Sequence, residues 1–462
     1  ERASYFPESQ REFGSGSDMG MNEYSFWALT ADEAPDGIAT ERNISRYAFG
    51  EAFDANKLRY QYASKNWETG EYEKLPWIYQ SDWYTGLFET GTTFNNSVTI
   101  DGGNGKGTST RLSITDSRND WIVPNTGFNR QSISLSFDSE INKHINLKAR
   151  VNYYHRESDN LPVSGYSESS PMYALVWGYN SNSINDWKNE YFQGRFNEIN
   201  YNGDGTNGNS LVFPSASSYN PYRTLYEELN TLDKDRVFGN VALNIKLMKG
   251  LTLDVKSGLD INNEFRTQQK PFLTKSAPRG FYREQTIRTY EYNNDFLLRY
   301  ENNKWVDDRL GFNAAIGGNR MERKHFTNSI TLEELNEEGI YNTENIPSGL
   351  QPKPSNYRNK KMVNSLYGFI SASWDDTYFL DITGRNDWSS SLSKKNWSFF
   401  YPSVGTSILL DKALNLREKA SWIDMLKLRI SWANVGNDTS PYSLSQYYAG
   451  TSFPGGSKLP GT

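Results

Sequence analysis

Few residues of this chain have the types and spacing that bond-making chemistry requires. Two acidic pairs, Glu227–Glu228 and Glu333–Glu334, could act as the two carboxylates of a glycoside hydrolase. Adjacent acids more often lie on a solvated surface, and no spacing here favours catalysis. Cysteine is absent, and the three histidines lie far apart in the sequence, at His144, His155 and His325. We therefore expect a protein that is not an enzyme and that needs neither a metal centre nor a cofactor.

Two further stretches have some of the residues of an ion-binding loop. The run NGDGTNGNS at 202–210 has oxygen-bearing side chains at alternate positions, as in a calcium loop, but it lacks the distal glutamate. The run GGNGKGTST at 102–110 has the glycines and the lysine of a phosphate loop, yet no helix follows it. Turns are the favoured interpretation of both runs.

The composition argues against a nucleic-acid partner and against membrane-spanning helices. The 462 residues include 49 Lys and Arg against 55 Asp and Glu, which gives a formal net charge of -6. No run of five or more basic residues occurs, so no nucleic-acid partner is expected. No apolar run approaches the roughly 18 residues of a transmembrane helix. A transmembrane strand is shorter and stays compatible with this sequence.

The side chains instead alternate in type, as they do in a strand with one apolar and one polar face. In LTLDVKSGLDI, at 251–261, leucine, valine and isoleucine fall on one parity and mostly charged or small polar residues on the other. The alternation recurs at 131–138, 146–154, 240–247 and 425–432, and more weakly from near 94, 109, 286, 309, 364, 377 and 402. We therefore predict an all-β protein of about twelve strands of roughly 9 to 12 residues each.

The links between these strands favour a membrane barrel over a soluble sandwich. Alternation alone fits both, because each architecture buries one face of a sheet. Short turns are predicted near 138–145, 249–250, 302–308 and 375–376, and long links at about 156–235, 262–285, 319–362 and 386–399. Outer-membrane barrels have short turns at one end and long loops at the other. We therefore predict an antiparallel transmembrane β-barrel.

In such a barrel the apolar face meets lipid and the charged face lines the lumen. The alternative is that the charged face is the solvated side of a soluble sheet. The residues predicted to face the lumen are Lys148, Arg150, Asp254, Lys256, Asp260, Lys427 and Arg429.

Substrate contacts are expected on the long-loop side. Aromatic rings beside amides and carboxylates suit sugars or peptides, although the same rings could pack within the loops. The candidate substrate-binding residues are Trp177, Tyr179, Trp187 and Tyr191 in the longest loop, and Asn386, Asp387 and Trp388 in a later one.

Three stretches in this order resemble the SusC/RagA-type TonB-dependent outer-membrane transporters. The region 84–153 has an aromatic-Thr-Gly lead-in, an Asn-rich strand, the turn SVTIDGG and then GFNRQSISLSFD. The run YFLDITGRNDWSSSLSKKNWSFFYPSVGTSILL at 378–410 resembles the family's Arg-x-Asp-x-Ser-Ser stretch and the Phe/Tyr-Pro-Ser-Val strand after it. The run WIDMLKLRISWANVGN at 422–437 resembles its Leu-Lys-Leu-Arg strand, which ends in Gly-Asn.

The resemblance implies a barrel of about 22 strands that is filled by an N-terminal plug and driven through a TonB-contacting segment. Neither the plug nor that segment is visible in this sequence, and about twelve strands supply about half of such a barrel. We therefore expect a partial chain from the middle of the barrel. Residues 1–93 would be an early barrel segment with loops, and 94–462 would be barrel strands with long extracellular loops.

The resemblance also implies a function and partners. The function would be import of a glycan, an oligosaccharide or a peptide together with a SusD-like surface lipoprotein, with energy from the TonB complex. The location would be the outer membrane of a Gram-negative, Bacteroidetes-like bacterium, in contact with outer-membrane lipid, and the transporter–lipoprotein pairs could dimerise. The alternatives are a soluble surface β-sandwich that binds carbohydrate, and a β-rich glycoside hydrolase.

Overall fold

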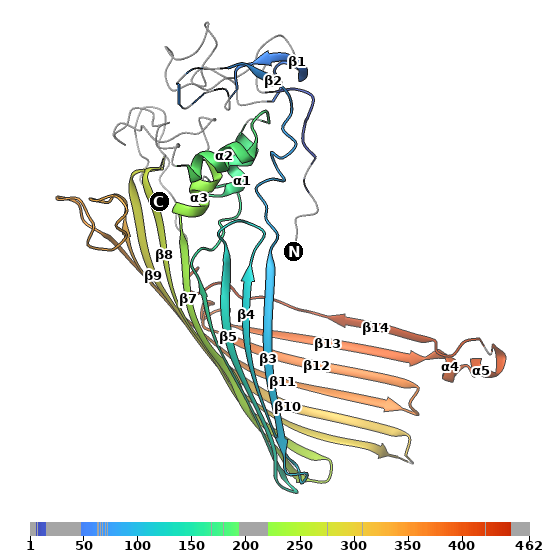
Figure 1. Cartoon of the computed structure of the whole chain (residues 1–462). Coiled ribbons are helices and arrows are strands. Elements are labelled where there is room, and N and C mark those ends of the chain that lie inside the picture. The colour runs from blue at the N-terminus through green and yellow to red at the C-terminus, as the bar shows by residue number, and fades with distance from the viewer. Residues whose placement is uncertain are drawn as a thin grey trace.

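The structure is a computed structural model dominated by one long antiparallel sheet (Figure 1). It describes residues 6, 8–14, 48–61, 64, 66, 68–69, 71, 73–167, 169–178, 180–193, 220–274, 276–306, 308–420 and 422–444. None of the helices in these ranges has the length and apolar character needed to span a membrane.

Twelve strands pair with their neighbours in chain order, so the sheet is a continuous antiparallel meander. This confirms the all-β, antiparallel fold predicted from the alternation. The strands are β3 (Thr92–Gly103), β4 (Thr108–Asp120), β5 (Gly127–Asn142), β6 (Ile145–Ser158), β7 (Asn230–Met248), β8 (Leu251–Thr274), β9 (Ala277–Trp305), β10 (Leu310–Leu332), β11 (Lys353–Trp374), β12 (Tyr378–Ser389), β13 (Ser398–Leu409) and β14 (Lys427–Ala433).

The central strands are longer than the sequence predicts. Strands β8 to β11 have 24, 29, 23 and 22 residues, about twice the length that crosses a bilayer. The long link predicted at 262–285 is therefore wrong, because β8 continues to Thr274 and β9 begins at Ala277. The link predicted at 319–362 shrinks to 333–352 for the same reason. Alternation fades in these extensions because both faces become largely polar, so the pattern gave no signal there.

The links at the two ends of the sheet differ in size. At the short-turn end, the connections at 104–107, 143–144, 249–250, 306–309 and 375–377 reverse the chain tightly. Gly250 has a φ of 79°, the left-handed region that glycine enters without strain. The link between β13 and β14 departs from this pattern, because it contains α4 (Leu410–Ala413) and α5 (Leu416–Lys419).

The long-loop end has larger connections. The loop from 159 to 229 contains α1 (Pro171–Trp177), α2 (Ile184–Phe192) and α3 (Pro221–Glu227), which lie beyond the ends of the strands in Figure 1. The loops 333–352 and 390–397 join later strands at the same end. This end therefore has three of the four predicted long links, whereas β8 and β9 are joined here by the short link between Thr274 and Ala277.

The described residues before β3 contribute no strand to the large sheet. They form a separate pair, β1 (Asp54–Arg59) and β2 (Leu75–Trp77). Trp83 and Leu87, which precede β3, are buried against the helices of the longest loop. The division predicted at residue 93 falls just inside β3 and stays a prediction.

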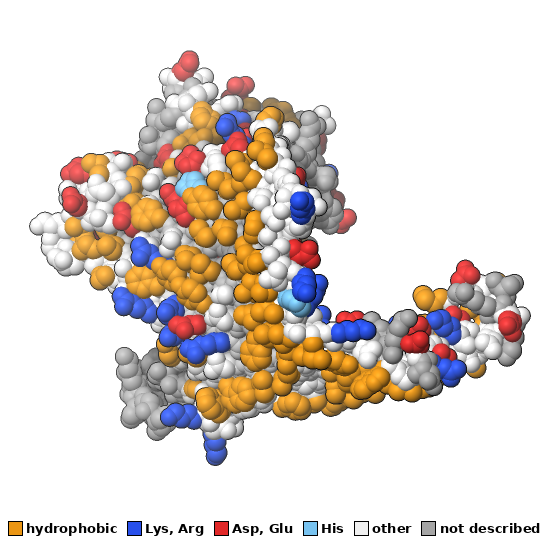
Figure 2. All heavy atoms as spheres, turned by 90° about the horizontal axis from the view of Figure 1, so that it is seen from below, with side chains coloured by type: hydrophobic (Ala, Val, Ile, Leu, Met, Phe, Trp, Pro, Cys, Tyr) orange, Lys and Arg blue, Asp and Glu red, His pale blue; other side chains and the backbone are white. Residues whose placement is uncertain are grey.

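The sheet is one layer thick. In the described part of the chain, no second sheet covers its apolar face, and the side chains there remain exposed. Figure 2 shows hydrophobic side chains gathered in a broad band on the surface. A soluble sandwich would bury such side chains against another sheet.

Candidate functional site

Cross-strand register joins the apolar residues of neighbouring strands into one face. Leu253 lies opposite Ile245 on β7 and opposite Leu298 on β9, and Leu298 lies opposite Ile316 on β10. Directly opposed residues of an antiparallel pair point to the same side of the sheet. The apolar parity of each strand therefore continues into the next, and we call this side the apolar face.

The opposite side of the sheet, here called the charged face, holds all seven residues predicted to line a lumen. They are Lys148, Arg150, Asp254, Lys256, Asp260, Lys427 and Arg429, each of which alternates with residues of the apolar face.

Several charged groups on this face are paired across strands. Nζ of Lys148 lies 3.3 Å from an oxygen of Asp138, which is directly opposite on β5. Arg236 on β7 donates to Asp260 through its Nε at 2.8 Å. Because positive and negative groups alternate across the face, it has a mixed charge that suits a polar filling or water.

Two helices of the longest loop, α2 and α3, are fixed by side-chain caps at their N-termini. The side chain of Ser183 accepts a hydrogen bond from the backbone of Asn185 at 3.1 Å and donates one to Asp82 at 2.7 Å. Asn220 accepts from the backbone of Tyr222 at 2.9 Å and donates to the carbonyl of Trp187 at 2.8 Å. Each cap satisfies backbone groups that a helix end leaves without partners. Ser183 also joins α2 to the segment before β3, and Asn220 joins α3 to α2.

These helices enclose a small core of their own, and Trp187 is part of it. Trp187 is fully buried, with its ring edge-on to the ring of Trp83 at 5.1 Å between centroids. The indole nitrogen of Trp83 donates to the carbonyl of Leu175 at 2.9 Å. The structure therefore places Trp187 in loop packing, which is the alternative that the sequence left open.

Of the other aromatic candidates in this loop, the structure describes the side chain of Tyr191 only. Tyr191 is half-buried on α2, where its ring contacts those of Phe192 and Tyr226. Burial raises the pKa of the Tyr191 hydroxyl, and the nearby carboxylate of Glu227 raises that pKa further. Trp177 ends α1, but its side chain lies outside the description, as do Tyr179 and the run 202–210.

The candidates on β12 do not share a face. Asp387 lies on the charged face, where its carboxylate accepts from Nε of Arg385 at 2.7 Å. Asn386 and Trp388 have the opposite parity and lie on the apolar face. Asn386 donates to the hydroxyl of Ser398 at 2.9 Å. The three residues are therefore not brought together as one binding surface.

The two acidic pairs bind separate bases instead of facing each other. Glu227 lies 3.3 Å from Nε of Arg223, while Glu228 lies 3.8 Å from the ammonium of Lys270. In the second pair, Glu333 binds Lys353 and Glu334 lies 3.8 Å from Nε of Arg279. A glycosidase needs two carboxylates on either side of one bond, and these pairs do not form such a site.

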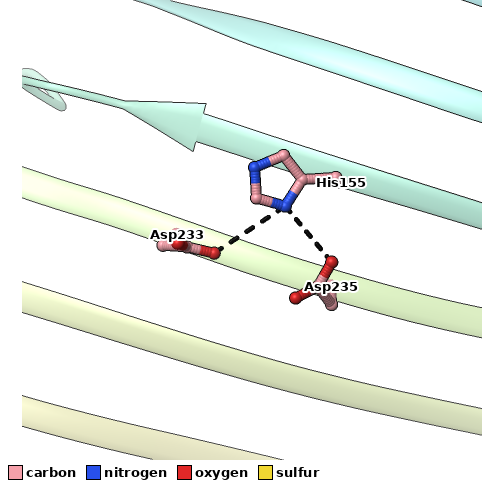
Figure 3. A group of neighbouring side chains, drawn as sticks. All are labelled: His155, Asp233 and Asp235. Atoms are coloured by element: carbon pink, nitrogen blue, oxygen red, sulfur yellow. Dashed lines mark hydrogen bonds and ion pairs between the residues drawn. The ribbon is translucent and has the colours of Figure 1, made fainter.

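The structure reveals one titratable group that the sequence analysis missed, made of His155, Asp233 and Asp235 (Figure 3). Nδ1 of His155 lies 3.2 Å from Asp235 and 3.8 Å from Asp233 on the neighbouring strand. Tyr153 donates its hydroxyl to the same Asp235 oxygen at 2.6 Å. An imidazole and two carboxylates could bind a divalent cation, but here they are already paired with one another. Only strand register brings His155 and Asp235 together, since 80 residues separate them in sequence.

No protein-family profile matches this chain, but TonB-dependent receptors are similar to it in sequence. The TonB-dependent receptor SusC of Bacteroides thetaiotaomicron is 23% identical over 408 residues, which are 82% of this chain and 37% of that receptor. A TonB-dependent receptor of Formosa agariphila is 23% identical over 78% of this chain and 34% of its own length. The chain thus spans only about a third of the length of these curated relatives.

The fold is shared with a solved transporter. The structure of the RagAB peptide transporter matches 82% of this chain and 41% of its own, with a TM-score of 0.63 and 19% identity. The same importer in its open-open state gives a TM-score of 0.61. None of these relatives is named as an enzyme, in agreement with the expectation from the sequence. By its sequence relatives and by its fold, the chain is similar to the SusC/RagA-type TonB-dependent receptors.

Proposed function

We propose that the full-length protein imports a glycan, an oligosaccharide or a peptide across the outer membrane of a Gram-negative, Bacteroidetes-like bacterium. A SusD-like surface lipoprotein would cap the long-loop end, the TonB complex would supply the energy, and the transporter–lipoprotein pairs could form a dimer. The observation that carries this proposal is a meander of twelve strands with one exposed apolar face and one charged face.

The dimensions of the apolar face support contact with lipid. From Leu251 to Ile261 the apolar parity of β8 is interrupted only by Ser257. Ten steps of about 3.3 Å, tilted by about 45°, rise about 23 Å, close to the apolar band of outer-membrane barrels. Monomeric soluble proteins rarely expose a continuous apolar surface of this extent.

The charged face would then line the lumen. The seven predicted lumen residues share that face, and their mixed signs favour contact with a polar plug and water. Of the residues predicted to contact substrate, Asp387 has the best position, because it lies on the charged face near the long-loop end of β12. Tyr191 on the half-buried helix α2 is the second.

The test is fractionation and uptake with the full-length protein. We expect it in the outer-membrane fraction, soluble only with detergent, and we expect the SusD-like lipoprotein to be purified with it. Cells should take up a fluorescently labelled oligosaccharide or peptide prepared from their growth substrate. Loss of TonB should abolish that uptake. A protein that stays monodisperse without detergent, or uptake that persists without TonB, would overturn the proposal.

Asp387→Asn sharpens the test of the site. We expect uptake to fall severalfold while the amount of protein in the outer membrane stays the same. The matched control is Asp381→Asn, on the charged face of the same strand but nearer the short-turn end. Equal uptake by the two variants would remove Asp387 from the site without affecting the transport proposal.

A further inference from the structure

The apolar face ends in a group of basic side chains on three neighbouring strands. We call this group the basic band: Arg288 on β9, Arg320 and Lys324 on β10, and Arg358 and Lys360 on β11. All five side chains are on the apolar face. Lys324 lies directly opposite both Tyr290 and Lys360, and Phe326 lies opposite both Arg288 and Arg358.

The basic band lies at the long-loop edge of the apolar residues. We call the positions on the apolar face outward positions. On β10 the outward positions Phe312, Ala314, Ile316 and Gly318 come directly before Arg320. On β9 the tyrosines Tyr290 and Tyr292, followed by Asn294, separate Arg288 from the apolar stretch. Tyrosines are typical of the boundary between hydrocarbon and lipid headgroups. If the apolar face meets lipid, the basic band therefore lies at the headgroups of the outer leaflet.

Most of the charge in the basic band is not neutralised. Glu322 is the single carboxylate among the outward positions of β10 from Arg320 to Asn328, and it lies 3.1 Å from Lys324 and 3.0 Å from Lys360. In the part of the chain that the structure describes, Arg288, Arg320 and Arg358 have no ion-pair partner. Arg358 lies over the ring of Phe326, 4.9 Å from its centroid. Three exposed guanidinium groups are thus available to an anion.

The residues of earlier strands that are level with the basic band, as traced through directly opposed pairs, carry a different charge. Following the row from Arg288 across the sheet leads through Asn263 and Asp235 to His155. There the outward positions of β6 and β7 include Glu157, Asp233 and Asp235. The positive charge of β9–β11 therefore does not continue across β8 onto β6 and β7.

A shallow groove lies below the basic band on the apolar face. It has a volume of about 750 Å³, and its lining includes Ala314, Ile316, Gly368, Gly384, Phe400 and Val404. Gly368 on β11 is eight residues from Lys360, which is about 26 Å along the strand and about 19 Å in depth at a tilt of about 45°. That depth is comparable to one leaflet of a bilayer with its headgroup.

We propose that the basic band binds the phosphate groups of a phosphorylated glycolipid of the outer leaflet, and that one of its acyl chains lies in the groove. This inference rests on the proposed membrane function. Guanidinium groups bind phosphate through two parallel hydrogen bonds, which explains why the unpaired cations include three arginines. The bound lipid would hold strands β9–β11 at a fixed depth in the membrane and beside the same lipid molecule.

The experiment uses the full-length protein in detergent micelles and bis-phosphorylated lipid A with a fluorescent label as the probe. The test variant is Arg320→Gln/Arg358→Gln. The control is Arg323→Gln/Lys353→Gln, which removes the same charge from the same two strands but on the charged face. Arg323 and Lys353 are exposed and pair with Glu291 and Glu333. We expect at least a tenfold loss of lipid affinity in the first variant and less than twofold in the second.

Two further binding measurements distinguish a lipid phosphate from free inorganic phosphate. Lipid A without its phosphates should bind at least tenfold more weakly than the phosphorylated probe, and inorganic phosphate should not compete at millimolar concentration. Equal loss in both double variants, equal binding of the dephosphorylated lipid, or displacement by inorganic phosphate would each overturn the inference. Elution profile and heat-modifiable migration on a gel confirm that the variants are folded. Failure of lipid binding in a protein that still imports its substrate would leave the proposed function intact.

Discussion

The same side-chain types are buried in the helical loop and exposed on the apolar face of the sheet. Trp187, Ile184 and Leu175 of the loop are each 0% exposed. On β14, Trp432, Ile430 and Leu428 are 60%, 63% and 47% exposed. The loop therefore folds as a soluble protein does, around a core that its own helices and the segment before β3 enclose.

The difference shows what each region needs from its surroundings. The loop gains its stability from contacts within the chain, since burial of large apolar side chains stabilises it without any partner. Among the described residues, the apolar face of the sheet has no such core, and its side chains lose contact with water only if lipid covers them. The two regions should therefore respond differently to mutation, and three changes test this.

Trp187→Ala should have the largest effect. Removal of a fully buried tryptophan should destabilise the loop by about 3–5 kcal/mol, whereas Trp432→Ala should have a much smaller effect because lipid can fill the space. In detergent-solubilised full-length protein, limited proteolysis should cut the 159–229 loop of the first variant much faster than that of the wild type. The barrel itself should keep its heat-modifiable migration. Equal protease resistance of the loop in both variants would contradict the proposed contrast.

Val255→Arg should have the next largest effect. It places a charge in the middle of the apolar stretch of β8 and should hinder barrel assembly by about 2–4 kcal/mol. The matched control is Lys256→Ser, the adjacent residue on the charged face, which should be tolerated. Assembly is measured as the heat-modifiable fraction in the outer membrane. If both variants assemble equally well, the apolar face does not meet lipid.

The smallest effect concerns Tyr341, in the loop that joins β10 to β11. Burial beside Tyr282 and Leu335, together with the nearby Glu227, raises the pKa of Tyr341 to about 12. A raised pKa means that the neutral phenol stabilises the fold. That contribution is complete below pH 10, the ordinary tyrosine value, and is lost as the pH rises towards about 12.

Tyrosinate absorbance during an alkaline titration checks this prediction. Tyr341 should be one of several tyrosines that ionise late in the wild type, and Tyr341→Phe should reduce the late step by one tyrosine. Loss of protease resistance in the 333–352 loop should follow the same pH range in the wild type but not in Tyr341→Phe. A late step of unchanged size in Tyr341→Phe would contradict the raised pKa of Tyr341.

Much of the fold could be predicted from the sequence because the apolar face has a period of two. The parity in 251–261 and in its counterparts placed the strands and assigned all seven charged residues to one face. The candidate site was harder to predict, because residue type does not distinguish an exposed aromatic ring from a buried one. Trp187 belongs to the loop core, and Asn386 and Trp388 lie on the apolar face.

The sequence by itself determined the periodicity, the number of strands in the large sheet, most of the turns and loops, and the resemblance to a transporter family. These features depend on neighbours that are close along the chain. Tertiary structure alone decided that β8–β11 reach about twice the length that crosses a bilayer, that the longest loop has its own core, and which charges meet across strands. Such contacts depend on register between strands that are far apart in sequence, and alternation fixes the face of a side chain without fixing its partner.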